Sequence, residues 1–237
     1  MNRPNIIGLT GLVCSGKDTV AELLATHLRF SQLAFADALR NEICEAFEID
    51  ESFLTRRDTK EVPTLALALC RCNKTSGFMM AVMSHFKWLE SGKSIRDEFS
   101  RPRSPRQIMQ LWGTEYRRTW SGSSYWTRTL VSRVHAQQKA QQWRHVVSDV
   151  RFDNEVDAIR AMGGVIWQIK RPGIKHDTAH VSETDGTRFK PDVVINNCHD
   201  IKHLQGVVMG AWLMAETGLK DNDVINIGQS YSRICAA

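Results

Sequence analysis

The feature that most constrains this chain is a glycine-rich segment between a short apolar run and an amphipathic pattern. Gly11-Leu-Val-Cys-Ser-Gly16-Lys17-Asp18 fits the spacing G-x-x-x-x-G-K, with Asp where Ser or Thr usually follows. Residues 5–10 predict a buried strand, and residues 17–29 predict a helix with one apolar face. A strand entering and a helix leaving such a loop direct backbone amides and a helix N-terminus at an anion. The segment therefore predicts a phosphate-binding loop.

The individual loop residues suit the phosphates of ATP. The glycines let the backbone wrap the phosphates, and Lys17 would reach the β- and γ-phosphates. The alternative is an ordinary glycine-rich turn with a surface lysine. We expect the ATP-binding residues to be Gly11, Ser15, Gly16, Lys17, Asp18 and Thr19.

Asp18 departs from the usual loop pattern. A hydroxyl at this position normally ligates Mg²⁺, whereas a carboxylate repels phosphates unless a cation lies between them. Asp18 would hold the metal directly or through water, or Thr19 would replace it as ligand. The sequence leaves these alternatives open.

A second carboxylate, Asp149, ends the apolar run 145–149, which predicts another buried strand. In open α/β sheets ligands bind at the carboxyl ends of the strands, so Asp149 and Arg151 are expected at the ligand-binding edge. Asp149 would then lie beside Mg²⁺. The alternative is that Asp149 caps the helix that follows it.

The order of elements predicts an α/β fold. Short apolar strands alternating with amphipathic helices indicate a mostly parallel, five-stranded sheet in a three-layer arrangement, with helices on both faces. We expect one domain over 1–237, with 50–104 as a substrate-binding or lid-like helical insertion and 219–237 as a polar tail. The other predicted strands are 33–35, 165–170 and 192–196, and the other predicted helices are 37–48, one beginning near Pro105, 124–141, 152–162 and 200–215.

The helix predicted from Pro105 has a distinctive polar face. Arg106, Gln110, Gly113 and Arg117 follow i, i+4, i+7, i+11 spacing and would share that face. Two guanidinium groups, an amide and a gap suit a phosphate and a base edge, although a solvated face would look similar. A central glycine costs about 1 kcal/mol in an exposed helix, which favours close approach of a ligand.

Composition limits the kind of binding partner and the cellular compartment that we expect. The net charge of +5 suits an anionic partner, either nucleic acid or a phosphorylated small molecule. Six scattered cysteines without a C-x-x-C pair indicate reduced thiols. No apolar run approaches the roughly 18 residues that span a bilayer, and the N-terminal run is too short for a signal peptide. We therefore expect a cytoplasmic protein without a membrane partner.

The chain resembles the bacteriophage-type deoxynucleoside monophosphate kinases, relatives of the dephospho-CoA and adenylate kinases. The motifs that carry this resemblance occur in family order through nearly the whole chain, weakly across 50–104. They are Ser15-Gly-Lys-Asp-Thr19, Phe35-Ala-Asp37-Ala-Leu-Arg40, 106–117, Tyr125-Trp-Thr-Arg128, Ser148-Asp-Val-Arg151 with Glu155, Ala161-Met-Gly-Gly, Lys170-Arg-Pro-Gly173, His180-Val-Ser-Glu183 and Asp192-Val-Val-Ile-Asn196-Asn197.

The resemblance implies a P-loop kinase that converts ATP·Mg²⁺ and a deoxynucleoside monophosphate to ADP and a deoxynucleoside diphosphate. The family also carries Asp after the loop lysine, as here at Asp18. The implied catalytic residues are Lys17, Arg128, Asp149 and Arg151, with Asp18 and Asp149 at the metal and Arg171 beside ATP or in a closing lid. The expected substrate-binding residues are Asp37, Arg40, Arg106, Gln110, Gly113, Thr114, Arg117, Trp126 and Arg128.

Several alternatives remain at this stage. Trp126 would stack on a base or pack in the core, and neither His180 nor Glu183 receives a chemical role. A dephospho-CoA kinase-like enzyme would share the loop and the end-of-strand carboxylate. A P-loop ATPase binding nucleic acid through the arginine-rich segment 96–133 is a rival from another class. We expect small-molecule partners without stable nucleic acid; the preferred base and the oligomeric state, a homodimer included, stay open.

Overall fold

The computed structural model describes residues 4–56, 58–73, 76–87, 94–173 and 189–215, and the backbone of 225–227. The chain forms two compact units. The first unit contains Met1–Phe35 and Leu130–Ala237, and the second contains Ala36–Thr129. The insertion predicted at 50–104 falls within the second unit, which begins earlier and ends later in the chain.

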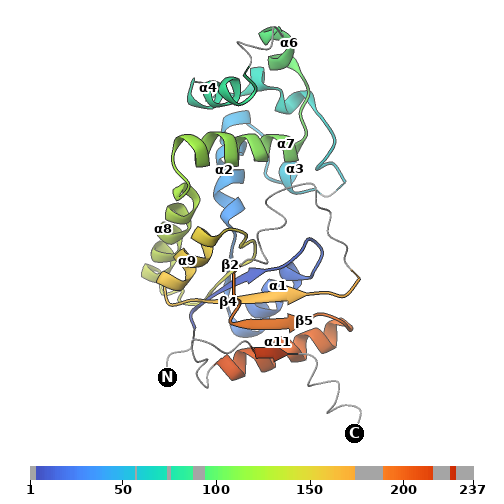
Figure 1. Ribbon diagram of the computed structural model, residues 1–237, viewed down its shortest axis with the longest axis vertical. Helices are drawn as coiled ribbons and strands as arrows, with labels where there is room; N and C mark the ends of the chain where they lie inside the picture. Colours follow the sequence, from blue (N-terminus) through green and yellow to red (C-terminus); the bar gives the residue numbers. More distant parts are fainter. Residues whose placement is uncertain are drawn as a thin grey trace. The chain divides into compact units, whose positions relative to one another are not determined.

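The first unit contains a six-stranded parallel sheet with the order β2-β3-β1-β4-β5-β6 (Figure 1). Four predicted strands are present at or near their predicted bounds, while β2 lies mostly before the predicted range 33–35; the predicted parallel α/β fold is confirmed. The sixth, β6, lies within the range predicted as a polar tail. The strands are β1 (Ile6–Thr10), β2 (Ser31–Leu33), β3 (His145–Val147), β4 (Val165–Lys170), β5 (Val193–Asn196) and β6 (Ile225–Ile227).

Helices cover both faces of this sheet, as the alternation along β1 requires. Ile7 and Leu9 pack in one cluster with the apolar faces of α1 (Lys17–Leu28) and α11 (Ile201–Ala215). The intervening Gly8 faces α9 (Asp153–Ala161), where an added Cβ would lie 2.7 Å from Ile159 Cδ1. A side chain at position 8 would therefore require the apolar side chains between the sheet and α9 to shift.

The edge strand β2 leads directly into a helix. The apolar triplet Leu33-Ala-Phe35 was predicted as strand, but β2 ends at Leu33 and α2 (Phe35–Phe47) begins two residues later. The last helix before β3 is α8 (Tyr125–Lys139), whose C-terminal part belongs to the first unit. Its Leu130 and Val134 are buried.

The second unit is helical. Its aromatic core centres on Trp112, which packs against Phe47, Phe78 and Tyr116. Besides α2 and the start of α8, its elements are α3 (Ser52–Thr55), the 3₁₀ turns η1 (Leu65–Leu67) and η2 (Leu69–Arg71), α4 (Ser76–His85), α6 (Ile95–Ser100), α7 (Pro105–Gln110) and η3 (Leu111–Arg118).

The helix predicted from Pro105 changes character halfway. Ser104 and Gln107 form a capping box, and Pro105 occupies the first turn of α7. From Leu111 the chain continues as a π-helix, η3. Because i→i+5 hydrogen bonds widen each turn, the α-helical spacing that aligned Arg117 with Arg106 no longer holds. The prediction of one shared face is therefore wrong for the η3 residues.

Among the described residues, no helix is both long enough and apolar enough to cross a bilayer.

His145 makes the stability of the first unit dependent on pH. It is fully buried at the start of β3, and burial lowers the pKa of its imidazole below the usual 6.5. The unfolded chain then binds a proton that the folded chain resists, so the free energy of unfolding falls as the pH drops below about 6.5. At higher pH this contribution does not change.

We expect His145→Phe to flatten the dependence of unfolding free energy on pH between 7 and 5, measured by urea denaturation. The slope lost is at most about 1.4 kcal/mol per pH unit for one proton. Val147→Ala, at another buried residue of β3, should lower the unfolding free energy at every pH and retain the wild-type slope. Equal slopes in wild type and His145→Phe would contradict the assignment.

Candidate active site

The phosphate loop runs between β1 and α1 with a backbone that only some residues can adopt. Gly11 and Gly16 have φ values of 142° and 103°, and Cys14 adopts a φ of 62°. A Cβ at Gly11 would lie 2.3 Å from the carbonyl oxygen of Ile169 at the end of β4. Conformation and close backbone approach therefore both require glycine at position 11. The loop lies between a buried strand and the N-terminus of α1, which is the order of elements predicted from the motif.

Asn197 supports this loop from the end of β5. Its Nδ2 donates to the carbonyl oxygen of Ser15 at 2.9 Å and lies 2.5 Å from the position of a Cβ at Gly16. The sequence resemblance included Asn197 but gave it no role. The available signal was its position directly after a predicted strand, at the carboxyl edge of the sheet.

Lys17 is held against the loop itself. Its Nζ donates to the carbonyl oxygens of Gly11 and Leu12 at 2.9 and 2.8 Å. Burial lowers the pKa of Lys17, and the charge of Arg151 lowers it further, whereas Asp18 and Asp149 raise it. These effects show that the structure gathers the predicted lysine, arginine and two carboxylates at one place in the first unit.

The hydroxyl of Ser15 is a further polar group in the loop. Ser15 is 1% exposed, and its Oγ has no hydrogen-bond partner in the described part of the chain. A buried hydroxyl without a partner costs free energy, typically 1–3 kcal/mol. An oxygen-rich ligand in the loop would supply that partner. Thr19, by contrast, is partly exposed in the first turn of α1.

Asp149 has a structural role other than the two predicted from the sequence, a position beside Mg²⁺ and a cap on the helix that follows it. Its Oδ1 accepts a hydrogen bond from the backbone N–H of Phe35 at 2.8 Å, at the first residue of α2. A carboxylate there satisfies a donor at the helix N-terminus. The helix that follows Asp149, α9, is instead supported by buried Glu155, which accepts from the N–H groups of Arg151 and Phe152 at 2.8 and 3.2 Å.

Arg171 is exposed directly after β4, and Gly173 follows it with a φ of 79°. The rest of this predicted loop, with His180 and Glu183, lies outside the described residues.

In the second unit, three of the predicted phosphate-binding arginines pair with carboxylates. Arg40 contacts both Asp37 and Glu51, with 2.7 Å between Nε and the Glu51 Oε1. Arg106 pairs with Glu61, and Arg117 pairs with Glu42. The guanidinium groups are thus oriented by acidic neighbours, of which the sequence analysis assigned Asp37 but not Glu42, Glu51 or Glu61.

Glu42 of α2 is the centre of the largest of these clusters. Its Oε2 accepts from Trp112 Nε1 and from Arg117 Nε, both at 2.7 Å, and its Oε1 accepts from the hydroxyl of Tyr125. Burial and this hydrogen bond raise the pKa of Tyr125 to about 12. The Arg117 guanidinium lies 4.4 Å from the ring centroid of Tyr116 and 4.7 Å from that of Tyr125. Arg117 is therefore fixed by one carboxylate and two rings.

Gly113 and Trp126 are explained by packing inside the second unit. A Cβ at Gly113 would lie 3.3 Å from Leu39 Cδ2, so a side chain of α2 occupies the space that the sequence analysis assigned to a ligand. Trp126 is 4% exposed, and its Nε1 donates to the Gly113 carbonyl oxygen at 3.1 Å. This arrangement favours packing over base stacking for Trp126.

The remaining predicted substrate residues lie in less buried positions. Gln110 is partly buried at the end of α7, and Thr114 is exposed on η3. Arg128 is exposed, and its guanidinium donates to the carbonyl oxygen of Ser121 at 3.3 Å.

The contact of Gly11 with β4 can be tested by substitution. We expect Gly11→Ala to lower the unfolding free energy by about 3 kcal/mol or more, because a Cβ collides with backbone and the φ is unfavourable. Gly163→Ala is the control, since Gly163 also has a positive φ of 77° but no atom within 4 Å of an added Cβ. It should lose only about 1–2 kcal/mol. Urea denaturation measures both, and equal losses would exclude the steric explanation.

The Glu42 cluster predicts a second difference in stability. Glu42→Ala removes the acceptor of three hydrogen bonds, so we expect an unfolding free energy lower by about 2–3 kcal/mol. Glu45→Ala, an exposed carboxylate on the same helix, should cost about 0.5 kcal/mol or less. A small, equal effect in both variants by thermal or urea unfolding would show that the Glu42 contacts contribute little.

Comparison with known proteins agrees with this geometry. The family model for deoxynucleotide monophosphate kinase matches residues 59–208. A putative deoxynucleotide monophosphate kinase of Acanthamoeba polyphaga mimivirus is 28% identical over 207 residues, which cover 86% of this chain and 94% of that protein. The deoxynucleotide monophosphate kinase of Enterobacteria phage T4 is 25% identical over 236 residues, covering 84% and 95%.

Among solved structures, the dephospho-CoA kinase from Campylobacter jejuni aligns with a TM-score of 0.45 at 12% identity, covering 92% of this chain and 100% of that one. The family model spans more than half of the 237 residues, and the suspected resemblance is confirmed. The chain belongs to the deoxynucleotide monophosphate kinase family.

Proposed function

We propose that this protein transfers the γ-phosphoryl group of ATP to a deoxynucleoside monophosphate, forming ADP and a deoxynucleoside diphosphate. The observation that carries the proposal is the loop around Lys17, where this partly buried ammonium donates to two loop carbonyl oxygens and is influenced by the charges of Arg151, Asp18 and Asp149. A family member with this arrangement has the charges that phosphoryl transfer requires.

Lys17 would bind the phosphates of ATP by exchanging its two loop carbonyl acceptors for phosphate oxygens. Its ammonium donates to two loop carbonyls, and burial disfavours its charge. Anionic phosphate oxygens would offer stronger, charge-assisted hydrogen bonds and would stabilise the charged form. The Ser15 hydroxyl and the N-terminal amides of α1 would add neutral donors around the same phosphates.

The residues present suit Mg²⁺, which prefers carboxylate and water oxygens to nitrogen or sulfur. Asp18 and Asp149 supply such oxygens, and both influence the charge on Lys17. These two carboxylates would hold the ion, directly or through water. When bound, Mg²⁺ neutralises charge on the phosphates of ATP.

The acceptor would be bound by arginines of the second unit. Arg40, Arg106 and Arg117 each pair with a carboxylate, which orients the guanidinium before a ligand arrives. A monophosphate oxygen attacks the γ-phosphorus, and the bond from that phosphorus to the β,γ-bridging oxygen breaks, releasing ADP. Because the acceptor phosphate is already ionised, no protein base is needed. Arginine and lysine charges stabilise the transferring group.

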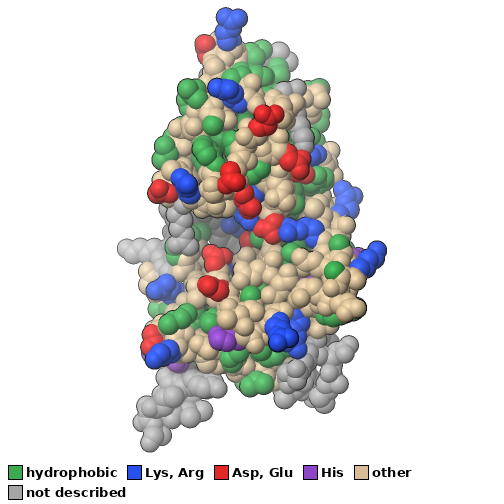
Figure 2. All heavy atoms as spheres, turned by 180° about the vertical axis from the view of Figure 1, so that it is seen from behind, with side chains coloured by type: hydrophobic (Ala, Val, Ile, Leu, Met, Phe, Trp, Pro, Cys, Tyr) green, Lys and Arg blue, Asp and Glu red, His purple; other side chains and the backbone are tan. Residues whose placement is uncertain are grey.

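Two rival functions predict different substrates. A dephospho-CoA kinase would use the same loop but a different acceptor. A nucleic-acid-stimulated ATPase would need a basic surface along the nucleic acid backbone. On the face displayed in Figure 2, acidic and basic side chains are interspersed, which suits small-molecule substrates better than a continuous nucleic-acid track.

The reaction is tested by measuring ADP release from ATP and Mg²⁺ with each deoxynucleoside monophosphate, each ribonucleoside monophosphate and dephospho-CoA. We expect turnover with at least one deoxynucleoside monophosphate. Lys17→Ala should lower that rate by about 100-fold or more, because the transferring group loses its nearest cation.

Lys139→Ala is the matched control, since this lysine is exposed at the end of α8. It should keep the wild-type rate. Turnover with dephospho-CoA alone, or ATP hydrolysis that appears only when DNA or RNA is added, would contradict the proposal and support the corresponding rival.

A further inference from the structure

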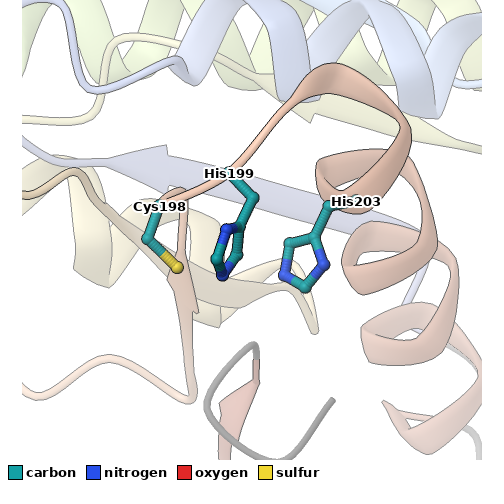
Figure 3. Close-up of side chains that lie close together, drawn as sticks. All are labelled: Cys198, His199 and His203. Carbon is teal, nitrogen blue, oxygen red and sulfur yellow. The ribbon is translucent and has the colours of Figure 1, made fainter. Parts of the chain in front are cut away.

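Three metal-binding side chains gather where the sheet meets the N-terminus of α11. Cys198 and His199 follow β5, and His203 lies in the first turn of the helix. One potential ligand atom from each lies within 4.8 Å of the other two. In Figure 3 the thiol and the two imidazole rings turn toward a common space. None of the three has a role in the proposed phosphoryl transfer.

We propose that Cys198, His199 and His203 form a binding site for zinc or a similar transition-metal ion. A thiolate sulfur and two imidazole nitrogens are ligands that Zn²⁺ prefers, whereas Mg²⁺ and Ca²⁺ prefer oxygen. The spacing H-x-x-x-H also occurs in zinc sites. Three protein ligands leave one tetrahedral position for water.

The geometry needs only small side-chain movements to close around an ion. Bond lengths of 2.0–2.3 Å in a tetrahedron put ligand atoms roughly 3.4–3.8 Å apart. The three potential ligand atoms now lie within 4.8 Å of one another, so they would have to move only slightly closer. Cys198 and His199 are exposed, so rotation of their side chains meets little resistance. Asp200 Oδ1 accepts from the His203 N–H at 2.9 Å and fixes the helix start that carries His203.

The cluster lacks strong internal interactions that would compete with a metal. Among the described residues, the Cys198 Sγ makes one long hydrogen bond, donating to the carbonyl oxygen of Asn196 at 3.8 Å. His203 Nε2 is buried and has no hydrogen-bond partner among the residues that the structure describes. The two imidazole rings meet edge to face with centroids 4.5 Å apart.

The candidate metal site takes no part in the proposed reaction, but it adjoins a residue that supports the phosphate loop. Asn197, which immediately precedes Cys198, donates to the phosphate-loop carbonyl of Ser15. A metal ion bound at Cys198 and His203 would join the two ends of the short connection between β5 and α11. The ion would therefore have a structural role beside the phosphate loop, distinct from the Mg²⁺ that accompanies ATP.

The test uses Co²⁺ as a spectroscopic probe on the full-length, untagged, metal-stripped protein. We expect one Co²⁺ to bind per chain with a sulfur-to-cobalt charge-transfer band, and Zn²⁺ to displace it. Cys198→Ser should abolish the band, and His199→Gln should weaken binding at least tenfold. Both positions are exposed, so these variants should fold like the wild type. Cys70→Ser, at another exposed free cysteine, should behave as the wild type does.

A second readout is thermal unfolding. Zn²⁺ should raise the midpoint for wild type and Cys70→Ser but not for Cys198→Ser, because only a folded site stabilises by binding. An unchanged charge-transfer band in Cys198→Ser, or the absence of any stoichiometric band in the wild type, would overturn the proposal.

Discussion

The close passage of the chain at Gly11 is the constraint on which the rest of the first unit depends. Here the backbone leaving β1 comes within reach of the Ile169 carbonyl at the end of β4, and no Cβ fits between them. Six residues later α1 begins at Lys17, whose Nζ donates back to the carbonyl oxygen of Gly11. Asn197 secures the other side of the loop through Ser15. The anion-binding geometry is therefore built from neighbouring strand ends as much as from the loop.

Within each of the two units, charged side chains are held in place before any ligand arrives. Lys17 is partly desolvated beside Arg151 and two carboxylates, while Arg117 is fixed by Glu42. Such preorganisation reduces the reorganisation needed when charge develops during phosphoryl transfer.

Sequence patterns were most informative where one local rule decides the structure. Four of the strands, the phosphate loop and the helices of the first unit follow from apolar periodicity and glycine spacing. The sequence patterns failed where contacts with residues distant in the sequence decide the structure. The widening of the Pro105 helix into η3 broke the α-helical face, and Leu39 occupies the space beside Gly113. The spacing of Cys198, His199 and His203 is compatible with a metal site. The sequence analysis did not predict one, because it considered only C-x-x-C pairs.

The sequence by itself determined the parallel α/β fold, the phosphate loop and the family, because these rest on contiguous residues with a fixed local order. Only the tertiary structure decided the partners of those residues. It joined Asp149 to the first N–H of α2, Glu42 to Trp112 and Tyr125, and Asn197 to the loop. Such pairs lie tens of residues or more apart, and a side chain's spacing along the chain does not encode which distant donor or acceptor will fold against it.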